Sequence, residues 1–175
     1  MIVKTKFKDL FIFKNKSFID KRGHFKELVK EKVIKKKLPF TVMSFSKKNV
    51  IRGLHIQTKN SQGKFISVLK GKIYDVALDL RKNSKTFGKV FKCILSEANS
   101  NSLYIPEGFA HGYIVKSERS IVVYKCTNYY DKNDEFGIKW NDSSLNLNWR
   151  CSNPIISDKD KSLPFLDEQK NLPEY

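Results

Sequence analysis

The sequence predicts an all-β domain of the sandwich or barrel type, and three observations support this class. The chain has 175 residues, which is the length of a single domain. Hydrophobic residues make up 40% of it and aromatic residues 13%, which supplies a core without disulfides or metal and excludes a disordered chain. Short apolar runs alternate with turn residues at close spacing. No repeat or linker interrupts the chain, so we expect one domain over residues 1–175.

A strand at 3–13 and a helix at 26–37 are the first elements that the pattern predicts. In the helix, apolar residues recur on one side, and Pro39 then stops it. The chain up to residue 127 otherwise has the pattern of strands. From Asn141 onward, Asn, Ser and Pro predict loops and short helical turns packed on the barrel. The remaining strands are expected at 40–46, 64–70, 72–80, 88–95, 102–105, 112–115 and 120–127.

The runs at 64–70 and 72–80 form a hairpin, because Lys70-Gly71 lies between them. Side chains alternate between the two faces of a strand. In the second run this alternation places the carboxylates of Asp75 and Asp79 on one, partly polar face. Apolar and aromatic residues occupy the other face: Tyr74, Val76, Leu78 and Leu80.

The chain carries 34 basic and 18 acidic residues, a net charge of +16 that attracts anions. Only five of the basic residues are Arg, on which specific nucleic-acid readers depend. We therefore expect a lysine-rich surface or a phosphorylated small ligand, and no nucleic-acid partner. No apolar run is long enough to span a membrane, and the first residues lack a signal-peptide core, so we expect no membrane partner. Three separated cysteines, Cys93, Cys126 and Cys151, indicate reduced thiols in a cytoplasmic protein.

Two of the three histidines lie in settings that suggest a function. His55 lies in the strand-like run 50–57, and His111 follows a tight turn. Inward-facing histidines in a jelly roll are typical of a cupin, and many cupins bind metal. A metal cupin needs a second histidine two positions on, but Gln57 stands there, so we expect no metal. Alternation in 50–57 predicts two opposite faces, one with Arg52, Leu54 and Ile56 and the other with Gly53, His55 and Gln57.

Eight blocks of residues occur in the order and near-spacing of one enzyme family. They are Arg52-Gly53-Leu54-His55-Ile56-Gln57, Gln62-Gly63-Lys64, Asp75-Val76-Ala77-Leu78-Asp79-Leu80-Arg81, Thr86-Phe87-Gly88, Leu95-Ser96, Ile105-Pro106-Glu107-Gly108-Phe109-Ala110-His111-Gly112, Tyr124-Lys125-Cys126-Thr127-Asn128-Tyr129-Tyr130 and Gly137-Ile138-Lys139-Trp140-Asn141-Asp142. In these blocks the chain resembles the dTDP-4-dehydrorhamnose 3,5-epimerases and their relatives acting on other nucleotide-activated 4-keto sugars.

The resemblance implies a cupin-type jelly roll that forms a homodimer, uses no metal and no organic cofactor, and serves surface-polysaccharide synthesis. The implied substrate is a nucleotide-diphosphate 4-keto-6-deoxy sugar, whose ketone acidifies the hydrogens on C3 and C5. A base removes one hydrogen, and an acid on the opposite ring face returns a proton. The resemblance assigns His55 as the base and Tyr124 as the acid. Without the resemblance, we would expect Tyr124 to be an aromatic residue that fills the barrel. Asp160, or alternatively Asp158, is the carboxylate that orients the base.

Further residues are expected to bind this substrate. Negative charge that develops on the ketone oxygen requires cationic donors, and Lys64 fits that role with Arg52 and His111 beside it. Asp75 is expected to support the histidines, and Gln57 to contact the sugar nucleotide.

The segment that follows Asp20 matches the family's D-x-R-G motif. It is expected to bind the diphosphate through Arg22, with Phe25 and Glu27 in the same pocket-lining stretch. Tyr129, with its neighbour Tyr130, is expected either to stack on the nucleobase or to lie at an interface.

The sequence departs from the family pattern at three positions. Phe40 and Val42 stand where a Gln and an Asn usually line the pocket, and His24 stands where many members have Phe or Tyr. These departures leave open the nucleotide, the sugar (a dTDP-hexose or a GDP-heptose) and whether C3, C5 or both are inverted. Two other functions also stay open: a cupin 3,4-ketoisomerase, which product analysis would reveal, and a non-catalytic cupin that only binds sugar nucleotides.

Overall fold

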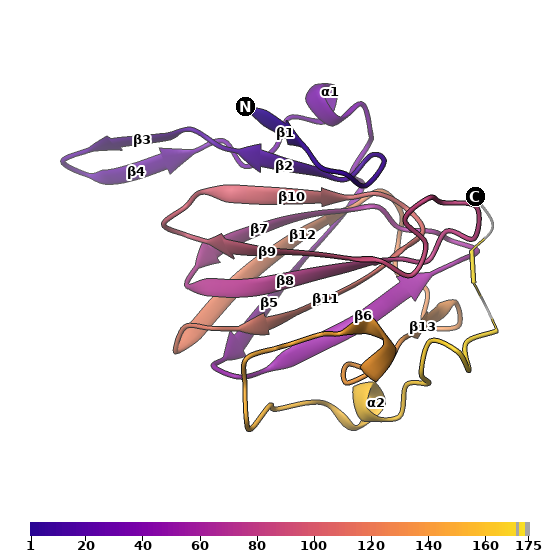
Figure 1. Cartoon of the computed structure of the whole chain (residues 1–175). Helices are drawn as coiled ribbons and strands as arrows, with labels where there is room; N and C mark the ends of the chain where they lie inside the picture. The colour runs from indigo at the N-terminus through magenta and orange to yellow at the C-terminus, as the bar shows by residue number, and fades with distance from the viewer. Residues whose placement is uncertain (171, 174–175) are drawn as a thin grey trace.

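The computed structural model describes residues 1–170 and 172–173, and most of its elements are strands in two antiparallel sheets (Figure 1). One sheet has six strands in the order β1-β2-β10-β7-β12-β5, and the other has five in the order β13-β6-β11-β8-β9. Two such sheets packed face to face around a shared core form a jelly roll, so the predicted fold class is confirmed. None of the helices in the described residues has the length and hydrophobicity that crossing a membrane requires.

The bounds of the elements follow the two sheets. The six-stranded sheet contains β1 (Ile2–Lys4), β2 (Phe11–Lys14), β10 (Asn101–Ile105), β7 (Lys64–Lys70), β12 (Arg119–Cys126) and β5 (Phe40–Lys47). The five-stranded sheet contains β13 (Glu135–Gly137), β6 (Ile51–Gln57), β11 (Phe109–Val115), β8 (Lys72–Asp79) and β9 (Val90–Ser96). A hairpin of β3 (Ser17–Asp20) and β4 (Gly23–Lys26) stands apart from both. The helical elements are α1 (Glu31–Ile34), η1 (Ser143–Leu145) and α2 (Asp158–Lys161).

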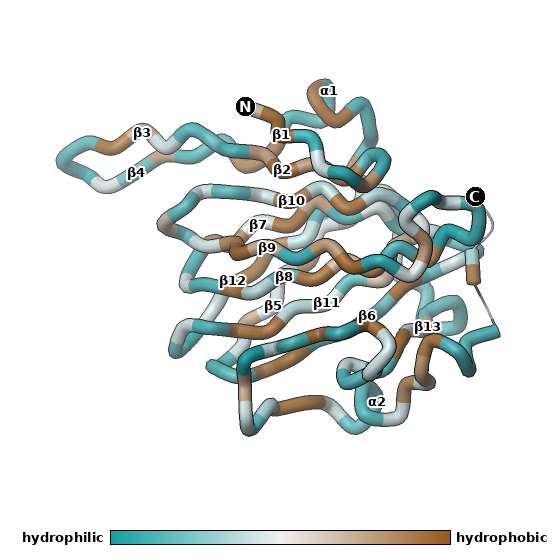
Figure 2. The backbone as a smooth tube through the Cα atoms, in the orientation of Figure 1, coloured by the Kyte–Doolittle hydropathy of each residue, from teal (hydrophilic) through white to brown (hydrophobic). Residues whose placement is uncertain are grey.

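Two hydrophobic clusters lie on the two faces of the five-stranded sheet. Between the sheets, Ile73 and Ala77 of β8 belong to the same buried cluster as Ile66 of β7. On the outer face, Val76 belongs to a second cluster that includes Trp149 from the C-terminal tail. The two predicted faces of 72–80 and the predicted packing of the tail on the barrel are therefore confirmed. Figure 2 shows hydrophobic stretches recurring along this tail.

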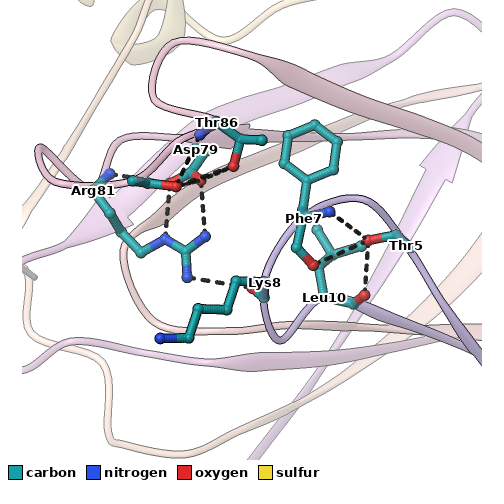
Figure 3. Close-up of polar contacts among 8 residues, drawn as sticks. Thr5, Phe7, Lys8, Leu10, Asp79, Arg81 and Thr86 are labelled. Carbon is teal, nitrogen blue, oxygen red and sulfur yellow. Dashed lines mark hydrogen bonds and ion pairs between the residues drawn. The ribbon is translucent and has the colours of Figure 1, made fainter.

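The predicted strand at 3–13 is wrong in its middle. A turn separates β1 from β2, and within it the Thr5 hydroxyl accepts from the Phe7 amide and donates to the Leu10 carbonyl (Figure 3). Phe7 and Leu10 are almost fully buried in the core between the sheets. Phe7 packs edge-on against Phe91 and Phe109, so these two apolar residues of the predicted strand belong to a turn that fills the core.

The predicted helix at 26–37 is also wrong in most of its length, since only α1 is helical. Lys26 ends strand β4, and Lys35 has a left-handed φ of 54° that ends the helix. Val29 and Ile34 pack separately against a small buried cluster, and no residue of α1 is buried. A helix needs a buried face to be stable in water, so the apolar residues of this segment were not enough to form the longer helix that was predicted.

The hairpin β3–β4 is an element that the sequence pattern missed. Figure 1 shows it extending from the body of the molecule as an arm. Its strands pair Phe18 with Phe25 and Ile19 with His24. Phe18, Ile19 and Phe25 are all more than half exposed, so the arm presents apolar side chains that nothing in the described residues covers. We refer to residues 17–26 as the arm.

A buried ion pair anchors the loop after β8. Arg81 donates from Nε and Nη2 to the two carboxylate oxygens of Asp79, each at 2.8 Å (Figure 3). The hydroxyls of Ser84 and Thr86 donate to the same carboxylate, each at 2.7 Å. The guanidinium also lies 4.5 Å from the ring centroid of Phe109 and donates to the Lys8 carbonyl. This network fixes the 79–88 loop against Phe109 and the turn that contains Lys8.

Candidate active site

A cavity of about 470 Å³ is lined by both sheets and by the C-terminal tail. Strands β5, β7 and β12 contribute from the six-stranded sheet, and β6, β11 and β13 from the five-stranded sheet. The tail contributes α2 and the serine that precedes it. Seven of the residues expected at the site line this cavity: His55, Tyr124, Asp160, Lys64, Arg52, His111 and Tyr130.

A β-bulge in β6 places Arg52 and His55 on the same wall. Arg52 pairs with Tyr113 and His55 with His111, so two residues of β6 oppose the single Gly112 of β11. The strands approach so closely that a Cβ on Gly53, whose φ is +108°, would lie 2.5 Å from the His111 carbonyl oxygen. The predicted alternation, which separated Arg52 from His55, is wrong because of this extra residue.

His55 is held by a carboxylate from the tail. Its Nε2 lies 2.7 Å from Asp160 Oδ1, and Asp160 Oδ2 accepts from the Gly53 amide at 3.1 Å. Ser157 caps α2 by accepting from the Asp160 amide, which fixes the carboxylate in place. The alternative, Asp158, has a fully exposed side chain that pairs with Lys161. The carboxylate that contacts His55 is therefore that of Asp160.

The charge of Asp160 determines which ring nitrogen of His55 is free. Burial acts to raise the pKa of Asp160, but hydrogen bonds from His55, Gly53 and Ser157 outweigh it and lower the pKa below 3.8. The carboxylate is thus ionised at neutral pH and can only accept hydrogen bonds. In the neutral imidazole, His55 Nε2 then carries the proton, and the lone pair lies on Nδ1.

A second carboxylate, that of Glu135, lies near this free nitrogen. Glu135 Oε1 is 3.7 Å from His55 Nδ1, and the other oxygen accepts from Tyr130 and Lys159. Burial acts to raise the pKa of Glu135, but the hydrogen bond from Lys159 and the charge of His55 outweigh it, so the pKa lies below 4.5. Neither Glu135 nor Lys159 was predicted from the sequence. Glu135 lies in a three-residue strand, and Lys159 is one of 29 lysines, so neither had a pattern that could identify it.

Tyr124 lies on the opposite wall, in the middle of β12. Its hydroxyl is 3.4 Å from Ser44 Oγ, which is in turn 2.9 Å from the Tyr113 hydroxyl. Burial raises the pKa of Tyr124 well above 10.0, so the side chain keeps its proton at neutral pH. His55 and Tyr124 therefore approach the cavity from different sheets, one with a free lone pair and one with a proton to donate.

The cations of the cavity surround the same space. Lys64 Nζ lies 3.5 Å from the His55 carbonyl oxygen, and burial lowers the pKa of this lysine. Arg52 donates from Nε to Ser46 at 3.0 Å. His111 is almost fully buried, and its Nε2 lies 2.9 Å from Asp75 Oδ2, so the expected support of a histidine by Asp75 is present for this residue.

Comparison with known proteins identifies the family. The sequence profile described as dTDP-4-dehydrorhamnose 3,5-epimerase matches residues 4–168. The chain is 45% identical over 166 residues to the dTDP-4-dehydrorhamnose 3,5-epimerase of Shigella flexneri, covering 91% of this chain and 92% of that one. It is 43% identical to the Salmonella typhimurium enzyme of the same name, with 96% of each chain covered. The chain belongs to the dTDP-4-dehydrorhamnose 3,5-epimerase family. It is therefore an isomerase that acts on nucleotide sugars.

A solved structure of the family supports the fold. The dTDP-6-deoxy-D-glucose-3,5-epimerase of Legionella pneumophila, solved in complex with dTDP-4-keto-L-rhamnose, matches with a TM-score of 0.95 and 37% identity. The match covers 100% of this chain and 98% of that one. The jelly roll described here is thus the fold of this epimerase family.

Five of the expected binding residues of this epimerase do not line the cavity. Gln57 is buried, and its side chain bonds the backbone of Asn60, Tyr129 and Asp131, so it fixes the loop beside the site. Tyr129 is 61% exposed and contacts Phe40 with ring centroids 5.8 Å apart. The other three, Arg22, Phe25 and Glu27, lie in or next to the arm, away from the cavity of their own chain.

One wall of the epimerase cavity is apolar. Phe40 and Val42 of β5 line it and pair in register with Cys126 and Tyr124 of β12. Directly opposite residues of an antiparallel pair lie side by side on one face. Burial raises the pKa of Cys126, so its thiol is neutral. The substrate therefore meets charged groups on the His55 side and largely uncharged groups around Tyr124.

Proposed function

We propose that this epimerase inverts C3 and C5 of a dTDP-4-keto-6-deoxy sugar. The observation that carries the proposal is the placement of His55 and Tyr124 on opposing walls of one cavity, with the free Nδ1 of His55 on one side and a protonated hydroxyl on the other. The names of the relatives and the ligand of the Legionella structure support the nucleotide and the sugar class. Inversion requires a base and an acid on opposite faces of the ring, which this arrangement supplies.

In the first step, His55 Nδ1 removes a proton from the carbon next to the C4 ketone. The electron pair moves into the ring and onto the ketone oxygen, which gives an enolate. Asp160 stabilises the imidazolium that forms, because its carboxylate accepts from Nε2 at 2.7 Å. In the second step, Tyr124 donates its proton to the same carbon from the opposite face, and the configuration is inverted.

The enolate oxygen requires a positive environment that is already in place. Lys64 is the cation best placed for this role, because it is half-buried and lies beside His55. A cation in a site with little water stabilises developing negative charge far more than one in bulk solvent. Arg52, on β6 of the other sheet, adds a second positive charge to the cavity.

We also propose that the chain forms a homodimer in which the arm of each subunit reaches the cavity of the other. Arg22, the residue expected at the diphosphate, lies outside the cavity of its own chain, and its side chain is 84% exposed. The arm carries exposed Phe18 and Phe25, and the edge strand β5 exposes Met43. Exposed apolar edges of this kind are normally covered by a partner. Light scattering would measure the mass of the dimer. The variant Arg22→Ala should raise KM and leave this mass unchanged.

The test of the reaction is incubation with dTDP-4-keto-6-deoxyglucose in deuterated buffer, read by proton NMR. We expect deuterium at C3 and C5 together with the inverted product. His55→Asn should stop incorporation at both carbons while thermal melting shows an intact fold. Incorporation at the wild-type rate in this variant would move the base to another residue, with His111 next. A ketone shifted to C3 without inversion would indicate a ketoisomerase, and tight binding without turnover would indicate a binding protein.

The nucleotide and sugar are tested in the same assay. Turnover of the dTDP-hexose should exceed that of a GDP-activated 4-keto-6-deoxyheptose, as the names of the relatives indicate. The reverse preference would reassign the substrate and leave the chemistry unchanged. A cytoplasmic location and a role in surface-polysaccharide synthesis stay predictions.

A further inference from the structure

Two inversions at one site impose a requirement that a single inversion does not. After the first inversion the proton from the sugar is on His55 and Tyr124 has lost its own proton. A second abstraction needs the lone pair of His55 again. The proton must therefore leave His55 while the singly inverted sugar is still bound. This argument rests on the proposed function.

Asp160 and His111 are poorly placed to carry this proton away. The Asp160 side chain is 5% exposed, and its two oxygens are occupied by His55 Nε2 and the Gly53 amide. It also contacts the wrong ring nitrogen, because the proton from the sugar arrives on Nδ1. His111 is 4% exposed and bonded to buried Asp75. Neither residue connects Nδ1 to solvent.

Glu135 differs from both residues in the ring nitrogen that it faces and in its connection to the surface. Its carboxylate lies 3.7 Å from His55 Nδ1, on the side of the ring that receives the proton. It lines the cavity, and its side chain is 12% exposed. It is paired with Lys159, whose side chain is 52% exposed, and accepts from the Tyr130 hydroxyl. The groups around it lead from the catalytic histidine to the surface.

We propose that Glu135 is a proton relay that resets His55 between the two inversions. It is a positioning residue and not a catalytic one, since it acts through His55. Its carboxylate lies 3.7 Å from His55 Nδ1, so a small movement of either side chain would make the hydrogen bond through which the proton is taken up. The proposed role rests on the contact between the Glu135 carboxylate and His55 Nδ1, the ring nitrogen that takes the proton from the sugar.

The protons balance over one cycle. The proton taken from the sugar moves from His55 Nδ1 to Glu135 and then to water, and His55 regains its lone pair. Tyr124 regains the proton that it gave to the sugar from water that enters the cavity. A carboxylate that holds a proton only briefly suits this role, because the low pKa of Glu135 makes it release the proton quickly to solvent. Lys159 then pairs with the restored carboxylate.

The test follows the two inversions separately in Glu135→Gln. We expect the first inversion and its deuterium label to form at a rate close to that of the wild type. The second inversion should be slower by about tenfold or more, so that a singly inverted sugar accumulates and is released. Glu135→Asp should restore the double inversion. Asp158→Asn is the matched control, since it removes a charge from the fully exposed neighbour of Lys159 and should leave the product unchanged.

A second measurement distinguishes a relay from a structural role. In Glu135→Ala, added formate should restore the second inversion in proportion to its concentration, because a small carboxylate can replace the missing one. Equal slowing of both inversions, or no effect of formate, would overturn the proposal, as would normal double inversion in Glu135→Gln. If the wild-type protein leaves the sugar unlabelled, the proposed function itself fails and this role fails with it.

Discussion

His55 and Tyr124 belong to different sheets of the jelly roll and line the same cavity from opposite walls. Each is paired with a neighbouring strand that fixes its position: His55 with His111, and Tyr124 with Ile66 and Val42. A sugar ring between them has one face toward the base and the other toward the acid. Under the proposed mechanism, the sheet that carries each group sets the stereochemistry of the reaction.

Asp160→Asn should slow turnover by about a thousandfold while the fold is retained. The asparagine keeps the shape of the carboxylate, but its amide can donate to His55 Nε2. The proton would then be placed on Nδ1, which is the nitrogen that must be free. Rates measured by NMR in deuterated buffer, with a thermal melt for stability, check this. Asp158→Asn should behave like the wild type; wild-type turnover in Asp160→Asn would show that the base needs no orienting carboxylate.

Tyr124→Phe should separate proton removal from inversion. Removal by His55 does not need the hydroxyl, so deuterium should still enter the sugar, but largely with retained configuration. We expect inversion to be lost most severely at C5. The ring keeps its packing and the nearest partner of the hydroxyl, Ser44, is 3.4 Å away, so the stability should change by about 1 kcal/mol or less. Wild-type inversion in this variant would make Tyr124 a barrel-filling aromatic.

Dialysis against a strong chelator should leave turnover unchanged. The cupin position that would supply a second histidine holds Gln57, and its amide is bonded to the neighbouring loop. Within residues 1–170 and 172–173, no group of three His, Cys, Asp or Glu side chains is placed to hold a metal ion. Metal analysis before and after dialysis is the measurement. A stoichiometric metal whose removal abolishes turnover would contradict the expectation.

Asp79→Asn should lower the free energy of unfolding by about 3 kcal/mol, because it leaves the Arg81 guanidinium without its partner. Burial acts to raise the pKa of Asp79, but hydrogen bonds from Arg81, Thr86 and Ser84 lower it below 3.8. In acid, the native state then binds fewer protons than the unfolded state. The ion pair therefore stabilises the fold fully above pH 3.8, and this stabilisation is lost as the pH falls through the lowered pKa of Asp79. Urea unfolding at neutral pH and near pH 3 should show the difference between variant and wild type shrinking in acid.

Much of the fold followed from the sequence because strand alternation and turn residues are local. The faces of β8 and the positions of β7 and β12 could be predicted on that basis. The bulge at Gly53 could not, because it depends on how closely β6 and β11 approach one another. It reversed the expected orientation of Arg52 relative to His55.

The residues of the candidate site also fall into those that the sequence predicted and those that it did not. His55, Tyr124 and Asp160 were identified from a resemblance that extends along the whole chain, whereas Glu135 has no local pattern and is brought to the cavity by the pairing of β13 with β6. The arm was missed because β3 and β4 have four residues each and pair only with one another. A hairpin without a core to face shows little hydrophobic alternation.

The contact between His55 and Asp160 joins residues 105 positions apart, one in a sheet and the other in the tail. An isolated bridge from Val50 to Ile155 and the packing around Trp149 attach that tail to the barrel. Subglobal opening of the tail would take the carboxylate away from the base while both sheets stay folded. Catalysis should therefore disappear at a lower urea concentration than the far-ultraviolet circular dichroism of the strands, which makes enzyme activity a reporter of tail docking.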